Sequence, residues 1–268
     1  MRGQSNLNPE RSLAIVGTRS ATPYGINCTR EIVTTCSDFN ATIVSGLAYG
    51  IDVAAHKQAL KLNLTNYAVI AGGIDQLYPK VHQKIADKIC RNGAILSEQL
   101  PGTRPEAYLF PMRNRIIAGL SDATMVIEAA KKGGALITAN IAYSYDKSVF
   151  AVPGKLNEPF SEGCNQLIQS QKALIYTGAE TLAYNLNWTS QKHKNTQYKT
   201  LRKKLTTPKK IIYDLLLTAD YMSIDELSIK AKIEMNQMAN VLIALEFKDI
   251  IQLRPGKKYE LRNKFKDI

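Results

Sequence analysis

The sequence predicts an α/β protein with a doubly wound, mostly parallel sheet, followed by a small C-terminal winged-helix domain. Two observations predict the sheet: short apolar segments alternate with helical segments over residues 13–176, and most of these apolar segments end in a glycine-containing loop. Uncharged apolar segments of this length are typical of strands buried on both faces. The third observation is a C-terminal series of three amphipathic segments followed by two strand-like segments, which is typical of a winged helix.

The predicted strands share short runs of apolar and β-branched residues. In chain order they are Leu13–Gly17, Ala41–Ser45, Tyr67–Ala71, Ala94–Ser97, Ala123–Ile127, Ser148–Val152 and Ala173–Tyr176. The helices predicted between them are Ile26–Ser37, Ile51–Leu62, His82–Asn92, Met112–Leu120, Ala135–Ala142 and Asn165–Ser170. This alternation predicts parallel strands, and in such sheets ligands bind beyond the carboxyl ends of the strands.

One stretch joins a predicted strand to a helix through Lys132, Gly133 and Gly134. A helix that starts at a glycine pair presents free backbone N–H groups, and together with the helix dipole these form a site for an anion such as phosphate. Thr138 lies one turn into the helix, where its hydroxyl can add a hydrogen bond. The alternative is a tight turn that needs glycine only for its backbone angles, and this stretch alone does not decide between the two.

Other predicted strand ends carry similar small or hydroxyl-bearing residues. They are Gly17, Thr18, Arg19 and Ser20 after the first strand, Ser45 and Gly46 after the second, Gly72 and Gly73 after the third, and Pro153 and Gly154 after the sixth. These loops are expected to converge at one sheet edge that an extended anionic chain can approach, with turn chemistry as the alternative. Arg19 is the first candidate for a phosphate contact, because a guanidinium donates two parallel hydrogen bonds; a surface ion pair is its alternative.

Arg113 and Arg115 flank Asn114 near the start of the fourth predicted helix. The helix dipole favours acidic residues at that position, so the two arginines are expected to have a partner. The partner is either a phosphate or an internal carboxylate such as Glu98 or Glu128.

No residues of this chain form a recognisable catalytic pattern. Asp52 and His56 share one helix face, but no third group accompanies them, so a structural hydrogen-bonding role is the better prediction. The four cysteines lack metal-ligand spacing and are expected to be reduced thiols. No catalytic residue, metal or cofactor is therefore expected.

The charge of the chain favours a polyanionic partner. The net charge is +12 and the pI about 9.4; residues 191–268 hold 17 Lys/Arg against 9 Asp/Glu, and the run 192–210 contains eight basic residues and no acidic one. Four aromatic residues are candidates for stacking against bases, with packing in the core as the alternative: Tyr24, Tyr49, Tyr108 and Phe110. No apolar run approaches the roughly 20 residues that span a bilayer, and no signal segment is evident, so a cytoplasmic protein without a membrane partner is expected.

Six motifs cover nearly all of residues 13–170 in order. They are AIVGTRSATPYG at 14–25, IVSGLAYGIDVAAH at 43–56, FPMRNRIIAGLS at 110–121, KGGALITA at 132–139, VFAVPG at 149–154 and SEGCNQLI at 161–168. With these motifs the chain resembles the DNA-processing protein A (DprA/Smf) family. The resemblance implies a Rossmann-like domain that binds single-stranded DNA, forms homodimers and helps to load RecA-type recombinase during natural transformation and DNA recombination, without being an enzyme.

The chain departs from the family pattern in two places. Some members carry an N-terminal helical domain; because only about 12 residues precede the first predicted strand, that domain is expected to be absent. Characterised members have a DNA-contacting lysine three residues before the phenylalanine of their FP-x-RNR motif. This chain has Ala107 there, preceded by Glu106, with Arg104 as the candidate substitute.

The predicted domains are an N-terminal tail (1–12), a Rossmann-like single-stranded-DNA-binding domain (13–190), a basic linker (191–207) and a winged-helix domain (208–263). The winged helix is predicted from helices Lys209–Leu217, Ile224–Ala231 and Asn236–Phe247 and strands Ile250–Leu253 and Tyr259–Leu261. Its presumed recognition helix, Asn236–Phe247, carries only Glu246 as a charge. That composition favours a protein contact over groove reading.

A nucleotide-processing enzyme is the alternative function. A similar Gly-Gly-x-x-x-Thr loop on the same kind of sheet occurs in phosphoribohydrolase-like enzymes, which resemble a PGGxGTxxE pattern. The position that matches the glutamate of that pattern is Ile141 in this chain. The missing carboxylate argues against the enzyme.

Overall fold

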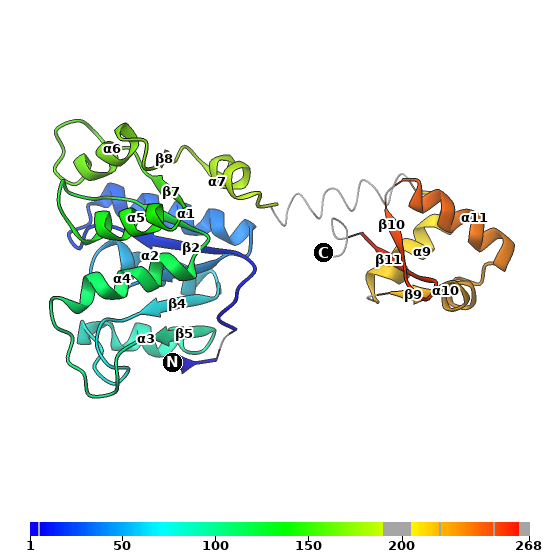
Figure 1. Ribbon diagram of the computed structural model, residues 1–268, viewed down its shortest axis with the longest axis horizontal. Helices are drawn as coiled ribbons and strands as arrows, with labels where there is room; N and C mark the ends of the chain where they lie inside the picture. The colour runs from blue at the N-terminus through cyan, green and yellow to red at the C-terminus, as the bar shows by residue number, and fades with distance from the viewer. Residues whose placement is uncertain (5, 190–204, 220, 249, 263–268) are drawn as a thin grey trace. The chain divides into compact units, whose positions relative to one another are not determined.

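A computed structural model describes residues 1–4, 6–189, 205–219, 221–248 and 250–262 of the chain. The chain divides into two compact units, Met1–Trp188 and Thr189–Ile268, both drawn in Figure 1. The predicted basic linker, 191–207, lies almost entirely outside the described residues.

The first unit is built on an eight-stranded sheet with the order β1-β5-β4-β3-β2-β6-β7-β8 (Figure 1). The strands are β1 (Arg2–Gly3), β2 (Ser12–Val16), β3 (Thr42–Ser45), β4 (Asn66–Val69), β5 (Gly93–Leu96), β6 (Ala123–Val126), β7 (Ser148–Ala151) and β8 (Leu174–Ile175). All pairs are parallel except β1, which runs antiparallel to β5. The predicted sheet is confirmed, but the segment predicted as a tail contributes β1, whose two residues are too few to show a pattern.

Helices cover both faces of this sheet. They are α1 (Pro23–Asp38), α2 (Ile51–Lys61), α3 (Gln83–Ile89) after the 3-10 turn η1 (Lys80–His82), α4 (Leu109–Leu120), α5 (Gly134–Ser144), α6 (Glu162–Gln169) and α7 (Ala179–Leu186). Successive side chains of β2 point to opposite faces. Leu13 and Ile15 therefore pack with α1, α2 and α7, while Ala14 and Val16 pack with α4, α5 and α6.

The order of strands reverses at β2. From β2 the chain moves outward through β3, β4 and β5, and then returns to the other side of β2 with β6. Val16 at the end of β2 is in register with Val126 at the end of β6. The loops that leave these two strands diverge to opposite faces of the sheet, so they open the crevice in which doubly wound sheets bind ligands.

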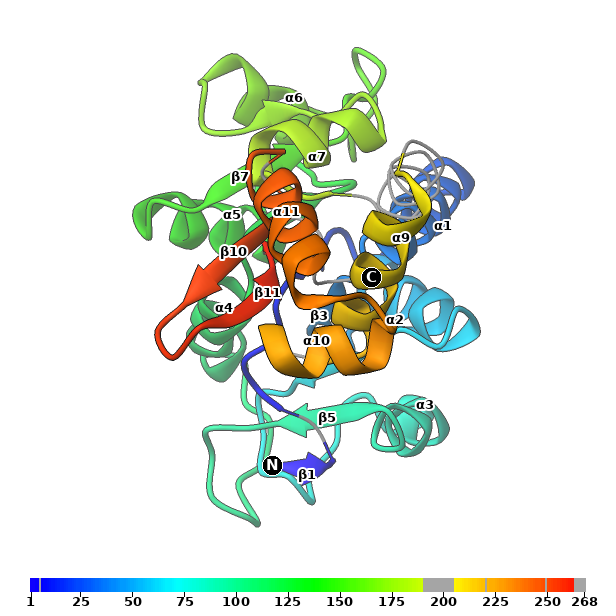
Figure 2. The same cartoon turned by 90° about the vertical axis from the view of Figure 1, so that its right-hand side faces the viewer.

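The second unit has the predicted winged-helix arrangement. Its elements are α9 (Thr207–Leu217), β9 (Met222–Ser223), α10 (Ile224–Ala231), α11 (Met235–Glu246), β10 (Ile251–Arg254) and β11 (Lys258–Leu261). Figure 2 shows the three helices beside the β10–β11 hairpin. The short strand β9, which the sequence did not predict, pairs with β11 and completes a three-stranded sheet. Among the described residues, no helix combines the length and apolar character that crossing a membrane requires.

Candidate nucleic-acid interface

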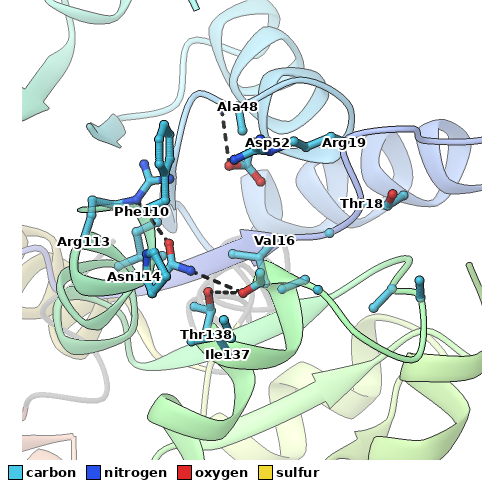
Figure 3. Close-up of a pocket in the computed structure, with 18 of the residues that line it drawn as sticks. Val16, Thr18, Arg19, Ala48, Asp52, Phe110, Arg113, Asn114, Ile137 and Thr138 are labelled. Carbon is cyan, nitrogen blue, oxygen red and sulfur yellow. Dashed lines mark hydrogen bonds between the residues drawn. The ribbon is translucent and has the colours of Figure 1, made fainter. Parts of the chain in front are cut away.

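A cavity of about 800 Å³ lies at the point where the strand order reverses. Figure 3 shows residues that reach it from the loop after β2, from the start of α2, from α4 and from α5. We call it the switch-point cavity. Nine of the thirteen predicted site residues line it: Gly17, Thr18, Arg19, Arg113, Asn114, Lys132, Gly133, Gly134 and Thr138. The other four, Ser20, Ser45, Gly46 and Arg115, do not.

The start of α5 forms one wall of the switch-point cavity. Gly133 precedes the helix in extended backbone, with φ 169° and ψ 168°, and no side chain caps the first N–H groups. An added Cβ would meet nothing within 4 Å at Gly133 or at Gly134. Neither backbone angle nor packing therefore requires glycine at these two positions, so the tight-turn alternative does not explain them. What the pair does provide is open space in front of unpaired N–H groups.

Two polar side chains hold the start of α5 in place. The Asn114 amide and the Thr138 hydroxyl both donate to the carbonyl oxygen of Gly134, at 3.3 Å and 3.2 Å. Thr138 itself is 1% exposed, so its predicted additional hydrogen bond is made within the helix. These contacts fix the orientation of the helix N–H groups.

Arg19 stands exposed on the loop after β2. Its guanidinium carbon lies 5.2 Å from the ring centroid of Phe110, within the range of a cation–π contact. The Phe110 ring in turn meets Tyr78 edge-on, with centroids 5.9 Å apart. None of the ion pairs found among the described residues includes Arg19, so the surface ion pair considered as its alternative is not formed there.

Arg113 has a different environment from the one predicted. It is 7% exposed, and it donates to the carbonyl oxygens of Gly46, at 2.8 Å, and Val69. Burial lowers the pKa of Arg113 to about 10, and the charge of Asp52 opposes that shift. Arg113 is therefore still charged at neutral pH, and it ties the ends of β3 and β4 to α4 while its edge lines the cavity. The carboxylate that acts on its charge is that of Asp52, neither Glu98 nor Glu128.

The position of α4 explains why this prediction was incomplete. The helix begins at Leu109, before the predicted Met112, because Pro111 is accommodated in its first turn, where proline is tolerated. Arg113 therefore lies in the second turn. The helix dipole acts mainly within the first turn, so it gives no reason to expect an anion beside Arg113.

Three further predicted site residues do not line the cavity and have other contacts. Arg115 is not among the residues that line the cavity and forms an ion pair with Glu98, which is the internal-carboxylate alternative. Ser45 is fully buried and donates to the carbonyl oxygen of Ile15 at 2.6 Å, so it joins β3 to β2. Gly46 is buried under Arg113, whose guanidinium lies 2.6 Å from where a Cβ would be. Ser20 lies in a neighbouring cavity.

The predicted structural role of Asp52 and His56 is confirmed. Asp52 accepts from the backbone N–H groups of Gly46, at 3.1 Å, and Ala48, at 3.4 Å. His56 accepts from the Leu47 N–H through Nε2 at 3.3 Å, and its Nδ1 lies 2.6 Å from the Asn66 carboxamide oxygen. Burial lowers the pKa of His56 to about 4, so it is neutral and donates to Asn66 through Nδ1.

Of the four aromatic residues predicted to stack against bases, Phe110 lines the cavity and the other three do not. Phe110 lines the cavity, whereas the Tyr24 hydroxyl donates to the Pro153 carbonyl oxygen and Tyr49 packs edge-on against His82. Tyr108 does not line the cavity. The sequence missed Tyr78, which lies in a loop without periodicity, so no local signal marked it.

The cavity can therefore hold an anion that has flat apolar parts. Arg19, Arg113 and Lys132 outnumber its single acidic residue, Asp52. The open end of α5 supplies N–H donors, and Phe110 with Tyr78 supplies aromatic surface. A chain of phosphates with bases attached has this combination of needs.

The first 187 residues match the family described as DNA recombination-mediator protein A. The chain is 34% identical over 257 residues to protein Smf of Escherichia coli, a match that covers 93% of this chain and 68% of that protein. It is 39% identical over 174 residues to the DNA processing protein DprA of Bacillus subtilis, where the match covers 65% of this chain and 59% of the relative. The chain thus spans little more than half of that relative's length.

Two solved structures are also similar. DNA processing protein A from Streptococcus pneumoniae has a TM-score of 0.65 at 37% identity, over 68% of this chain and 64% of that one. DNA processing protein A from Helicobacter pylori, whose structure concerns its single-stranded DNA binding mode, has a TM-score of 0.65 at 31% identity. The match covers 70% of this chain and 86% of that one. With a family match over most of its length and these relatives, the chain belongs to the DNA recombination-mediator protein A family.

Proposed function

We propose that this protein binds single-stranded DNA in the switch-point cavity and mediates DNA recombination without catalysing a reaction. The observation that carries the proposal is the open glycine pair at the start of α5, which lies in the same cavity as Arg19. Among the described residues, the Arg19 guanidinium forms no ion pair. Helix N–H groups and an arginine hold phosphates, while the Phe110–Tyr78 pair offers a face on which a base can stack.

The family supports the wider role. It is described as a recombination mediator, and the H. pylori relative binds single-stranded DNA. The proposed partner is a RecA-type recombinase, in natural transformation and recombination. Because the four cysteines are free thiols, we place the protein in the reducing cytoplasm.

The enzyme alternative lacks its key residue. Ile141, at the position of the catalytic glutamate, is half-buried and packs against the apolar cluster under α5. An isoleucine supplies no acid or base, so the carboxylate chemistry of phosphoribohydrolase-like enzymes has no source there. Incubating the protein with nucleoside monophosphates should accordingly release no free base.

The proposed assembly is a homodimer through the sheet domain. The edge strand β8 exposes both of its residues, Leu174 at 44% and Ile175 at 46%. An unpaired edge with apolar side chains is suited to pairing with a second copy, and two linked cavities bind one strand more tightly through avidity. Light scattering at tens of micromolar should give twice the mass of one chain, and a monomeric mass with and without DNA would contradict the dimer.

Ala107 stands where characterised family members have a lysine, and this changes the distribution of charge in the switch-point cavity. Ala107 lines the switch-point cavity, so a lysine at that position would add a cation there. In this chain Arg19 and Lys132 are the exposed cations of the cavity, and Arg104 does not line it. Phosphate binding is therefore expected to depend more heavily on Arg19.

The test is Arg19→Ala, with the exposed Arg91→Ala as a control that removes the same charge outside the cavity. Fluorescence anisotropy on oligo-dT and on a mixed-sequence strand across a salt series measures the log–log slope, which is about −0.7 per phosphate neutralised. Arg19→Ala should weaken binding on both strands and make the slope shallower by about that unit, without lowering the melting temperature. Unchanged affinity and slope in a folded Arg19→Ala protein would show that DNA does not bind in this cavity.

A further inference from the structure

A second cavity of about 630 Å³ lies between α1 and α2 and meets the first at Arg19, which lines both. The second cavity also adjoins the loop that begins α2, because Gly50 and Val53 line it while Ala48 and Asp52 line the first. We call it the basic groove. A chain held at Arg19 in the switch-point cavity is therefore next to the groove, because Arg19 belongs to both linings.

All of the charged residues that line the groove are basic. Its charged residues are Arg19, Arg30, Lys57 and Lys61, and its lining contains no aspartate or glutamate. The predicted site residue Ser20 lies there too, with its side chain exposed. Of the ion pairs found in the described part of the chain, none involves Arg30, Lys57 or Lys61.

Three of these cations lie close together on two neighbouring helices. Lys57 and Lys61 are four residues apart on α2, so they share one face, where like charges repel each other. Arg30 faces them from α1, and the Gln58 amide joins the two helices by donating to the Thr34 hydroxyl at 3.1 Å. A like-charge cluster held in a fixed position between two linked helices is suited to an anion that bridges them.

We propose that the basic groove binds the phosphates that flank those in the switch-point cavity, so that one strand passes through both and turns at Arg19. The inference rests on the proposed function and extends it. Lys57 and Lys61 are separated by about 6 Å along the helix axis, from four residues at 1.5 Å each. That spacing matches successive phosphates of an extended strand, and the groove offers no aromatic side chain that would bind a base instead.

The test compares two triple variants that remove the same charge. Arg30→Gln/Lys57→Gln/Lys61→Gln empties the groove of its own cations, and glutamine keeps helix propensity. Lys84→Gln/Lys88→Gln/Arg91→Gln is the control, because these exposed residues on and after α3 line neither cavity. Anisotropy is measured with oligo-dT of about 4 and about 16 nucleotides, the limits typical of single-strand-binding modules.

The groove variant should bind the short strand like the wild type and the long strand more weakly. On the long strand its log–log salt slope should be shallower by about 2, at about 0.7 per phosphate for three cations. The affinity ratio of wild type to variant should therefore fall about 16-fold between 50 and 200 mM salt. The control should change neither the length dependence nor the slope by more than a fraction of a unit.

Other outcomes overturn the proposal in distinguishable ways. If the groove variant and the control bind the long strand equally, the groove does not hold DNA, while the proposed function stands. If the groove variant loses short-strand binding as well, or melts at a lower temperature than the control, the three cations act on the fold or on the first cavity. If the wild type binds neither strand, the proposed function itself fails.

Discussion

Thr22 donates two hydrogen bonds to the buried carboxylate of Glu128, from its backbone N–H at 2.9 Å and from its hydroxyl at 2.5 Å. The backbone carbonyl oxygen of Glu128 accepts a third hydrogen bond, from the Thr18 N–H at 2.7 Å. Both ends of the loop that carries Arg19 are thus tied to Glu128, two residues after the end of β6. The loop after one strand is positioned by the end of its neighbour, across the point where the strand order reverses.

Glu128→Gln should loosen this loop, although glutamine has about the same size as glutamate. Because an amide nitrogen donates, the variant loses one of the two acceptors that Thr22 requires, which costs about 1–3 kcal/mol for a buried group. Urea unfolding should show that loss of stability, and anisotropy should show weaker binding of oligo-dT because Arg19 is less well positioned. Thr22→Val with Glu128→Gln should cost less than the two single variants together. Strictly additive costs would mean that the pair does not act as a unit.

His56 should make stability depend on pH. Burial lowers its pKa to about 4, whereas an unfolded histidine titrates at about 6.5. Between these values the unfolded chain binds a proton that the folded chain does not, so stability is lost as the pH falls from about 6.5 toward 4. The shift corresponds to about 3 kcal/mol over the whole window.

The measurement is the free energy of unfolding in urea at pH 7 and pH 5, for the wild type and for His56→Gln. Glutamine can accept from the Leu47 N–H and donate to Asn66, so it keeps both contacts without titrating. The wild type should lose about 2 kcal/mol more than the variant on acidification to pH 5. Burial raises the pKa of Asp52, which acts in the opposite direction, but Asp52 is present in both proteins. Equal losses would show that His56 is not held neutral.

The parts of the site that could be predicted from sequence are those set by local signals. Apolar segments and glycine loops are short-range patterns, and they predict that the loops at Gly17–Arg19 and Gly133–Gly134 lie at one edge; both loops line the switch-point cavity. Which strand-end residues face the cavity depends on packing between distant elements. Ser45 is also at a strand end, yet it faces the β2 backbone and is buried.

The contacts of Arg113 on α4 could not be predicted from local sequence either. The sequence predicts that this helix starts at Met112, whereas α4 begins at Leu109. The Arg113 guanidinium donates to the carbonyl oxygens of Gly46 and Val69. No local pattern encodes two carbonyl partners that lie 67 and 44 residues away in the chain.

The glycine pair gives the sharpest prediction, because it separates stability from binding. An added Cβ at Gly134 meets nothing within 4 Å, and Gly134 is the first residue of α5. Gly134→Ala should therefore fold normally and gain up to about 0.4–1 kcal/mol, because alanine has less freedom to lose on folding. Because the Cα–Cβ bonds of a helix tilt toward its N-terminus, the same methyl group should narrow the space at the helix N–H groups that are proposed to hold a phosphate.

The matched control is Gly119→Ala. Gly119 is an exposed helical residue of α4 whose added Cβ would lie 4.0 Å from the Tyr145 ring, an ordinary contact. Both variants should melt at or above the wild-type temperature, but only Gly134→Ala should bind oligo-dT more weakly. Losing one hydrogen bond to a charged group costs about 1.5–3 kcal/mol, which corresponds to about a tenfold to a hundredfold loss of affinity. If Gly134→Ala bound the strand as tightly as Gly119→Ala, the open end of α5 would not be where DNA approaches, and the proposal would lose the observation on which it rests.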